Sequence, residues 1–553
     1  MLKGHPKGLY VAFLTNMGER FGFYTMMGIL VLFLQAKFNL SADKAGIIYS
    51  IFYFLIYALA LVGGYIADRT QNYKGVVATG VVVMFAGYLL LAIPGMGLPV
   101  ALLGLLTIAF GNGLFKGNLQ AIVGQMYDNP EYSGLRDTAY SIFYMGINIG
   151  AMFAPNAAYA IQKWWMNTKG FAYDPDLPSL CNQFAQGTLT DFTKIGDLAT
   201  KVTGETVTNL EVFAKNYLEA LSTGYNYAFG IASIAMLISL TSYIIFKRHL
   251  PEKKKAEAGG AAAVPQMDKS EEKKRLTALL FVFLVVIFFW MSFHQNGLTM
   301  TFFARDYTVK SVSPLTNMLF NIWSLLSLGL TAAGLVFALK PSSTTKERGI
   351  GAAVAVVFGF VAYSLYNSFC SNFPDGNYIN PVIFQHFNAF FVVFLTPVIV
   401  ALFAWLRSKG KEPSAPRKIG IGMIIAAFGF VVLMIGSFGL PSPASLAGAP
   451  VPDAARVSTQ WLVNSYLVLT FAELFLSPMG LSFVSKVAPP RFQGLMQGCW
   501  LGATAIGNQL LFVGSFFWTR LPVWGVWAIF IVCCFISAVV MFSLLKRIER
   551  VTS

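Results

Sequence analysis

The sequence predicts an all-helical protein that crosses a membrane many times. The chain is 56% hydrophobic and only 12% charged over 553 residues, whereas soluble proteins carry about 25% charged residues. Its apolar blocks run for about 20 to 30 residues, the length with which a helix crosses a ~30 Å hydrocarbon core. A membrane β-barrel would instead alternate apolar and polar residues over segments of about ten. We therefore expect the spans to be helices.

Fourteen apolar blocks are long enough to be spans. In chain order they cover residues 10–36, 43–67, 75–94, 98–127, 134–163, 224–246, 276–304, 316–339, 349–370, 379–407, 416–440, 457–485, 494–517 and 523–545. The first block is kept as a span because it is too long for the apolar region of a cleavable signal. Most of the 40 Lys and Arg residues fall on the side of the N-terminus, so the positive-inside rule places both termini in the cytoplasm. Most of the net charge of +15 is thus explained by basic residues in cytoplasmic loops. The sequence shows no basic soluble domain, so we expect no nucleic-acid partner.

Two connections between spans are unusual. Residues 164–223 form an external insert whose apolar-periodic stretches near 187–200 and 205–221 suit short helices. This insert is either a structured surface loop or a lid that takes part in binding. Residues 247–275, rich in Glu, Lys, Gly and Ala, have the composition of a flexible cytoplasmic linker. The linker separates six spans from eight.

Five cysteines are present. Three of them, Cys499, Cys533 and Cys534, fall inside spans, where packing is the simplest role. Cys181 and Cys370 both fall on the external side of this topology, where an oxidising compartment would permit a disulfide. Nothing in the sequence brings these two together, so two free thiols are the alternative.

Charged residues occur inside the apolar blocks. The first span contains Glu19 and Arg20, the fourth contains Lys116, and the block at 457–485 contains Glu473. Placing a charge at the centre of a bilayer costs at least ~2.5 kcal/mol even on the gentlest insertion scale, so such residues face a polar interior. The sequence therefore predicts a functional cavity within the membrane.

Several motifs give the chain a family resemblance. The first span contains Glu19-Arg20-Phe21-Gly22-Phe23-Tyr24, which resembles the first-helix signature of proton-dependent oligopeptide transporters, a branch of the major facilitator superfamily. Similar segments follow in the family's order: Gly63 to Arg69, Gly113 to Lys116, Phe143 to Gly150, Ala472 to Ser482, and Gly498 to Trp500 followed by Ala503 to Asn508. Each is weak alone, whereas the ordered set is strong and covers about residues 10–155 and 276–545. The resemblance implies a gating role for four residues of the second segment: Gly63, Gly64, Asp68 and Arg69.

The resemblance also implies a fold. In the major facilitator fold two six-helix bundles surround a central cavity that opens to each side in turn. Residues 1–246 would form the first bundle, and residues 276–553 the second together with an extra hairpin at 316–370. Bacterial relatives usually carry such a pair between the sixth and seventh helices, so this chain departs from the family there.

A peptide at neutral pH is a zwitterion, so its site needs both a cation and an anion. Lys116 and Glu473 lie in opposite halves, and in relatives the matching residues face the carboxyl and amino ends of the peptide. The resemblance therefore implies that this pair binds substrate, and the alternative is that each charge has a structural partner. Aromatic and polar side chains suit the rest of such a cavity. The further expected substrate-binding residues are Arg20, Tyr24, Tyr57, Asn148, Asn388 and Trp500, with helix packing as the alternative for Tyr57 and Asn388.

Proton coupling is where the chain departs most from the family's pattern. The first-helix motif normally has two glutamates one turn apart, and here the first is Asn16, which cannot titrate. His294 stands where relatives commonly carry a glutamate, and an imidazole with an unperturbed pKa near 6.5 changes charge at physiological pH. A structural role is the alternative for His294 and for His386, a second imidazole within a span. We expect coupling through a reduced set: Glu19 with its neighbour Arg20, His294 and Glu473.

These observations predict a proton-coupled symporter that imports di- and tripeptides across a bacterial inner membrane. We expect a monomer without cofactor or metal, protons being the coupling ion. The first alternative is a related facilitator of another small zwitterion or anion, such as an amino acid or nitrate, although Glu473 argues against a simple anion. The second is a membrane enzyme or receptor that transports nothing. Against an enzyme, the sequence shows no metal-ligand cluster and no placed nucleophile and base.

Overall fold

The computed structural model describes residues 4–128, 130–132, 135–251, 268–341, 343–372, 376–489 and 492–552. Most of these residues are helical, and two short strands, β1 (Ser311–Val312) and β2 (Asn377–Tyr378), pair antiparallel with Ser311 opposite Tyr378. The greater part of the expected linker, residues 252–267, lies outside the described residues.

Each predicted span contains a helix. In chain order the helices are α1 (Lys7–Phe38), α2 (Ala42–Thr70), α3 (Tyr73–Ala92), α4 (Leu98–Met126), α5 (Arg136–Thr168), α6 (Leu177–Ala185), α7 (Thr193–Thr203), α8 (Leu210–Phe246), η2 (Lys247–His249), α9 (Lys269–Phe293), η3 (His294–Gly297), α10 (Thr299–Asp306), α11 (Pro314–Phe320), α12 (Ile322–Leu339), α13 (Thr345–Asn372), η4 (Pro381–Gln385), α14 (His386–Ser408), α15 (Ala415–Gly436), η5 (Asp453–Ala455), α16 (Gln460–Val487), α17 (Gln493–Gln509), α18 (Phe512–Trp518) and α19 (Val523–Thr552). Within the described residues, eleven helical stretches are long and apolar enough to cross a membrane. The prediction of an all-helical membrane protein is therefore confirmed.

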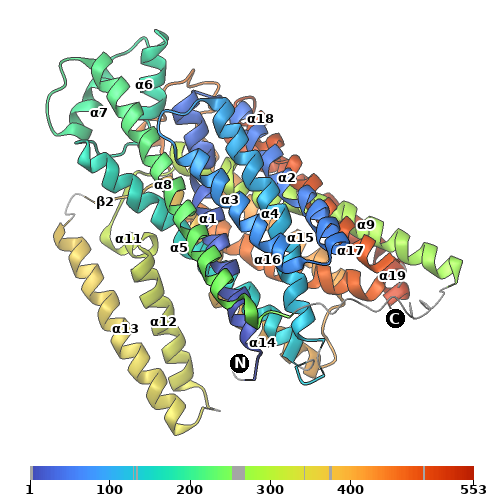
Figure 1. The fold of residues 1–553 in the computed structure, drawn as a ribbon. Helices are drawn as coiled ribbons and strands as arrows, with labels where there is room; N and C mark the ends of the chain where they lie inside the picture. Colours follow the sequence, from blue (N-terminus) through green and yellow to red (C-terminus); the bar gives the residue numbers. More distant parts are fainter. Residues whose placement is uncertain are drawn as a thin grey trace.

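The long helices form two groups (Figure 1). Helices α1 to α5 and α8 pack on one another and are called the first group, whereas α9 and α14 to α19 pack on one another and are called the second group. The groups meet where α2 contacts α17 and α18 and where α5 contacts α14. Helices α6 and α7 lie at one end of the molecule, the insert end, and both chain termini lie toward the opposite end (Figure 1).

Three predicted spans are interrupted, contrary to the expectation of continuous helices. The breaks separate α9 from α10, α11 from α12, and α17 from α18. Asn321 causes one of them, because its Oδ1 accepts hydrogen bonds from the backbone N–H groups of Trp323 (3.0 Å) and Ser324 (3.1 Å) and so starts a new helix.

The other two breaks are joined by one buried side chain. Gln295 Nε2 donates to the carbonyl oxygens of Met291 and Leu511, each at 3.1 Å, and its Oε1 accepts from Thr299 Oγ1 at 2.7 Å. An interrupted helix leaves carbonyl groups without their helical partners, which is costly where water is absent. Gln295 therefore stabilises the turn of its own span and the turn of its neighbour together.

The insert differs in detail from its prediction. Its helices are α6, which the periodicity did not indicate, and α7, which begins later than the stretch expected at 187–200. The stretch expected at 205–221 is not a separate helix, because it continues into the sixth span as α8. Asn209 Oδ1 caps this long helix by accepting from Val212 N–H at 3.1 Å, and Tyr217 is among the buried residues of its first turns. The insert therefore consists of an extension of α8 with two short helices, α6 and α7, that contact it.

The extra hairpin of α12 and α13 stands at the edge of the molecule (Figure 1). It contacts the rest of the bundle at a few places. The Trp323 ring lies 6.1 Å from the ring of Phe153 in α5, and a Cβ on Gly329 would lie 2.5 Å from the Phe394 ring of α14. Most of the remaining hairpin surface is exposed and apolar.

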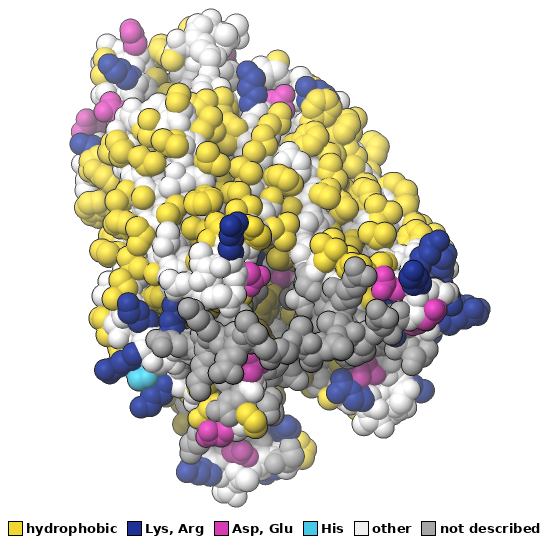
Figure 2. Space-filling view, turned by 45° about the vertical axis from the view of Figure 1, so that its right-hand side comes forward, with side chains coloured by type: hydrophobic (Ala, Val, Ile, Leu, Met, Phe, Trp, Pro, Cys, Tyr) yellow, Lys and Arg dark blue, Asp and Glu magenta, His cyan; other side chains and the backbone are white. Residues whose placement is uncertain are grey.

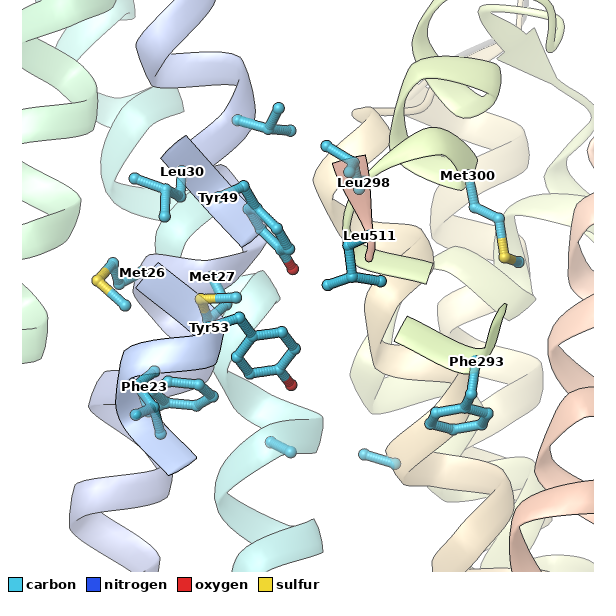
Figure 3. Close-up of a cluster of buried hydrophobic side chains, with 14 of the residues drawn as sticks. Phe23, Met26, Met27, Leu30, Tyr49, Tyr53, Phe293, Leu298, Met300 and Leu511 are labelled. Carbon is cyan, nitrogen blue, oxygen red and sulfur yellow. The ribbon is translucent and has the colours of Figure 1, made fainter. Parts of the chain in front are cut away.

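The two groups pack closely near the insert end. Figure 3 shows Tyr49 and Tyr53 of α2 directed toward Leu511 of the second group, and all three are buried. Small residues permit this approach, since a Cβ on Gly46 would lie 1.9 Å from Ser515 Oγ. The candidate site lies in the same interior, between these groups.

The outer surface suits a lipid environment. In Figure 2 hydrophobic side chains cover most of the middle of the visible face, whereas charged side chains gather toward its two ends. Soluble monomers seldom expose contiguous apolar patches beyond a few hundred Å². The surface therefore agrees with the apolar lengths of the helices.

Candidate functional site

The charged pair of the first span is buried and internally compensated. Glu19 is fully buried and Arg20 is 5% exposed. Arg20 Nε and Nη2 donate to the two carboxylate oxygens of Glu19 at 2.5 and 2.6 Å. Asn112 of α4 donates a further hydrogen bond of 2.7 Å to Glu19 Oε1. Buried charges persist when they are paired and hydrogen-bonded, so these residues form one neutral unit that fixes α1 against α4.

Lys116 of α4 has a different environment. Its Nζ lies 3.8 Å from the ring centroid of Tyr57 in α2, a cation–π contact. Among the described side chains, no carboxylate lies within salt-bridge distance of this ammonium group. The cation is therefore held by an aromatic face and remains able to bind an anion.

Glu473 of α16 lies in the second group and is 8% exposed. Its Oε2 accepts a hydrogen bond of 2.9 Å from Asn388 Nδ2 of α14, and its Oε1 accepts one of 3.4 Å from the Tyr144 hydroxyl of α5. Both donors are neutral, so they orient the carboxyl group without compensating a negative charge. The contact with Tyr144 also joins the two helix groups.

The aromatic residues expected in the cavity link these charges. The hydroxyl groups of Tyr24 in α1 and Tyr57 in α2 lie within electrostatic range of both Arg20 and Glu473. Lys116 in turn lies within range of Arg20. Side chains from α1, α2, α4 and α16 thus surround one interior region.

Two further expected residues, Asn148 and Trp500, make contacts with neighbouring side chains and backbone. Asn148 Nδ2 donates to the Tyr144 carbonyl oxygen of its own helix at 3.1 Å. Trp500 is buried, and its ring packs edge-on against Phe283 of α9 with centroids 6.3 Å apart. The structure therefore gives these side chains packing contacts, and their expected substrate role remains a prediction.

His294 lies in the turn η3 and not on a regular helix. Its Nδ1 is 2.6 Å from Asn508 Oδ1 of α17, and its ring stacks on Trp290 and lies beside Tyr53 of α2, with centroids 4.8 and 4.6 Å apart. Glu473 is not among its hydrogen-bond partners. The two residues are therefore not joined by a direct hydrogen bond in this conformation.

Asn16 and the second imidazole within a span, His386, make structural contacts in this conformation. Asn16 Nδ2 donates to the Phe143 carbonyl oxygen of α5 at 3.4 Å. His386 lies 3.2 Å from Asn156 Nδ2 of α5 and 3.2 Å from the Leu319 carbonyl oxygen of α11. Each therefore joins neighbouring helices.

The second-span motif marks a tight helix crossing. A Cβ on Gly63 would lie 2.1 Å from the Gly113 carbonyl oxygen of α4, whereas Gly64 faces open space. The Asp68 carboxylate accepts a hydrogen bond from the hydroxyl of Tyr73 at the start of α3, and Arg69 donates to the Tyr65 hydroxyl at 3.2 Å. Asp68 thus connects the end of α2 to α3, while Arg69 stays on its own helix.

The disulfide considered between Cys181 and Cys370 is absent from this structure. Both residues are free thiols, Cys181 buried in α6 and Cys370 exposed in α13. The described part of the chain also contains no group of His, Cys, Asp or Glu that could hold a metal ion.

Sequence reasoning missed two residues of the site. Tyr144 and Asn112 are the neutral partners of Glu473 and Glu19, and they come from α5 and α4. Tyr144 lies within the motif from Phe143 to Gly150, which was the available signal, whereas nothing near Asn112 in the sequence indicated Glu19.

Fold and site together define a membrane carrier, because a bundle of spans encloses a cation and an anion that do not compensate each other. A family model described as the POT family matches residues 74–263 and 362–519. These segments make up more than half of the chain, and the chain belongs to the POT family. The resemblance drawn from the motifs is thereby confirmed.

Similar proteins cover most of the chain. Dipeptide and tripeptide permease A of Cronobacter turicensis is 25% identical over 519 residues, covering 90% of this chain and 82% of the relative. A peptide transporter of Yersinia enterocolitica is 27% identical over 528 residues, covering 91% and 86%. A solved structure of a POT family transporter in complex with 5-aminolevulinic acid superposes with a TM-score of 0.59 at 21% identity, over 100% of this chain and 98% of that one. The structural likeness shows a shared fold.

Proposed function

We propose that this protein is a proton-coupled symporter that imports di- and tripeptides by alternating access. The observation that carries the proposal is the state of Lys116 and Glu473. Lys116 is a cation that lies against an aromatic ring, and Glu473 is an acid that accepts hydrogen bonds from neutral donors. The two residues come from different helix groups. A zwitterionic peptide would supply the missing opposite charge to each. The names of the relatives, permeases of dipeptides and tripeptides, support the same substrate class.

We infer further that the chain has the major facilitator arrangement of fourteen spans. Residues 1–246 and 276–553 would form its two bundles, joined by the linker at 247–275, with the hairpin at 316–370 as the addition. The helices at each predicted span and the two packing groups support this proposal. We propose a monomer in a bacterial inner membrane with both termini in the cytoplasm, which places the insert end outside.

The residues of the site have separate roles in this proposal. Lys116 binds the peptide carboxylate and Glu473 the amino group, while the remaining cavity residues contact the peptide backbone and side chains: Arg20, Tyr24, Tyr57, Asn148, Asn388 and Trp500. Glu19, His294 and Glu473 carry the proton, with Arg20 as the counter-charge of Glu19. The motif with Gly63, Gly64, Asp68 and Arg69 contributes to gating at the end opposite to the insert. No step needs a cofactor.

Uptake by the purified protein in liposomes tests this function. Labelled dipeptide should accumulate when the outside is more acidic than the lumen, and a protonophore should abolish accumulation. One elementary charge moved through 100 mV provides ~2.3 kcal/mol, enough for roughly fifty-fold accumulation. Uptake of free amino acids in preference to peptides would favour the alternative facilitator. Saturable binding of peptide without uptake would reject a carrier.

A further inference from the structure

A buried cluster of four charges lies at the insert end. Asp174 and Asp176, which precede α6, face Lys310 after α10 and Arg456 before α16. Lys310 Nζ lies 3.1 Å from Asp174 Oδ1 and 2.8 Å from Asp176 Oδ2, and Arg456 Nη2 lies 2.7 Å from Asp176 Oδ1. The side chains of both aspartates and of Arg456 are less than 5% exposed. At the more exposed rim, Lys194 Nζ of α7 lies 3.7 Å from Asp176 Oδ2, and Asp453 Oδ1 lies 3.1 Å from Arg456 Nε, so three carboxylates and three cations balance each other.

The negative side of the cluster is fixed to the first group. The Asp174 backbone N–H donates to the Tyr217 hydroxyl of α8 at 3.0 Å, and that hydroxyl lies 3.3 Å from the Asp174 carbonyl oxygen. The Asp176 N–H donates to Asp174 Oδ1 at 2.9 Å. The two carboxylates are therefore attached to the extension of the sixth span.

The positive side is fixed to the second group. Arg456 Nη1 donates to the carbonyl oxygens of Arg305 at 3.2 Å and Thr308 at 3.3 Å, and its Nε donates to Asp453 at 3.1 Å. The strand β1, directly after Lys310, pairs with β2 before α14. The ion pairs therefore cross from one helix group to the other.

The cluster borders a pocket of about 530 Å³ at the same end. The pocket is lined by both groups, with Gln35 and Ala36 of α1 on one side and Arg305 and Trp518 on the other. Arg305 Nη1 also crosses the boundary, since it donates to Gln35 Oε1 at 2.7 Å. The pocket opens to the surface between exposed residues such as Asn39 and Thr519. If the groups separated here, the pocket would widen and the buried charges of the cluster would meet water.

Such a cluster suits a contact that must both form and break. A buried ion pair loses hydration when it forms, so its net gain over the hydrated, separated charges is small. Removal of one partner is different, because it leaves an uncompensated charge in the closed, dry state only. The intact cluster thus allows two arrangements of similar free energy, and a broken cluster disfavours the closed one.

We propose that the insert at 164–223 is a clasp, in which Asp174 and Asp176 hold Lys310 and Arg456 and keep the insert end closed between transport events. The proposal rests on the proposed function only in assigning this closure to a transport cycle. The closure itself is a property of the two helix groups and can be measured without substrate.

Access to a pocket residue tests the clasp. Ala36 is 6% exposed and lines the pocket together with Asp176, so Ala36→Cys places a nearly buried thiol beside the cluster, at the boundary between the groups. Its reaction with a membrane-impermeant maleimide is followed in lipid nanodiscs by mass mapping of residue 36, without peptide or pH gradient. Adding Asp176→Asn should raise the labelling rate about tenfold, which corresponds to about 1.4 kcal/mol in the closing equilibrium. Lys310→Gln, at the edge of the cluster, should act in the same direction.

Matched variants separate the clasp from general loosening. Asp197→Asn makes the same chemical change on an exposed residue of α7 and should leave the rate unchanged. The exchange of Asp174→Lys with Lys310→Asp restores the charge balance and should return the rate toward that of the parent. The proposal would be overturned if Asp176→Asn and Lys310→Gln are labelled no faster than the Asp197→Asn control while the protein remains monodisperse. If Asp176→Asn does not fold, Lys310→Gln alone decides. Faster labelling in a protein that transports no peptide would reject the proposed function and retain the clasp.

Discussion

Lys116→Met should selectively weaken the binding of peptides that have a free carboxylate. Methionine keeps an unbranched apolar side chain over the Tyr57 ring, so the substitution removes the charge and little packing. Because the described side chains give Lys116 no carboxylate partner, we assign its charge to the ligand. A hydrogen bond to a charged group contributes about 1.5 to 3 kcal/mol. The Kd of a free dipeptide should therefore rise by about 10-fold to 150-fold.

The same dipeptide with an amidated C-terminus provides the second arm of a cycle. It lacks the carboxylate, so Lys116→Met should change its Kd by less than about twofold. The parent and the variant are each measured with both peptides, and the four Kd values isolate the pairwise interaction between the lysine and the carboxylate. Titration calorimetry of the purified protein measures all of them. Glu473→Gln should likewise weaken the binding of a peptide with a free amino group and change little the binding of the same peptide acetylated at its amino end.

A control for the loss of positive charge is Lys163→Met. Lys163 is exposed on α5, and its Nζ lies 5.8 Å from the Tyr159 ring, a similar cation–π contact outside the interior. This variant should bind both peptides as the parent does. If Lys116→Met weakens the free and amidated peptides equally, or neither of them, the assignment of the carboxylate to Lys116 is wrong.

Three further predictions address the fold, the pH response and the coupling. Gln295→Leu should lower the melting temperature in detergent, because it removes the partner of two carbonyl groups and one hydroxyl group at ~1 to 3 kcal/mol each; an unchanged melting temperature would contradict its role at the two breaks. Hydrogen bonds from Arg407 and then Lys418 lower the pKa of Glu412, in the loop before α15, from 4.5 to about 2. The ionised group therefore stabilises the fold above pH 4.5. The loss of stability in Glu412→Gln relative to the parent should shrink as the pH falls from 4.5 toward 2; a loss of stability that does not depend on pH would refute this. His294→Gln should retain exchange of labelled for unlabelled peptide but lose accumulation driven by a pH gradient, and accumulation equal to the parent would make His294 structural.

The spans could be predicted from the sequence because their cause is local. A helix of sufficient apolar length crosses the membrane whatever its neighbours are, and each expected block contains a helix. The interruptions were missed because two of them depend on Gln295, whose partner Leu511 is 216 residues away in the chain. The third interruption could have been predicted from the sequence, since Asn321 is a favourable N-cap residue before an apolar run.

The charged members of the site were found for a related reason. A lysine or glutamate inside an apolar block is conspicuous, so Lys116 and Glu473 could be selected from composition alone. Their environments could not be predicted in this way, because nothing in the sequence near Tyr144 or Asn388 indicates that the fold brings them to Glu473. The partners of Asp176 in the clasp, Lys310 and Arg456, likewise come from distant segments, and spacing along the chain carries no information about them.

The arrangement of charges gives a physical reason why occupancy and movement should be linked in the proposed carrier. Glu19 and Arg20 neutralise each other in this structure. Among the described side chains, Lys116 and Glu473 have no such partner. Water must therefore solvate them whenever the cavity is empty and open, and closure of an empty cavity would leave both charges dry. A zwitterionic peptide compensates both at once and removes that cost. A proton can also neutralise Glu473, and Lys116 can be neutralised by an anion or by loss of its own proton. Because the proposed symport carries both cargoes inward together, a peptide amino group on Glu473 leaves the co-transported proton to Glu19 or His294.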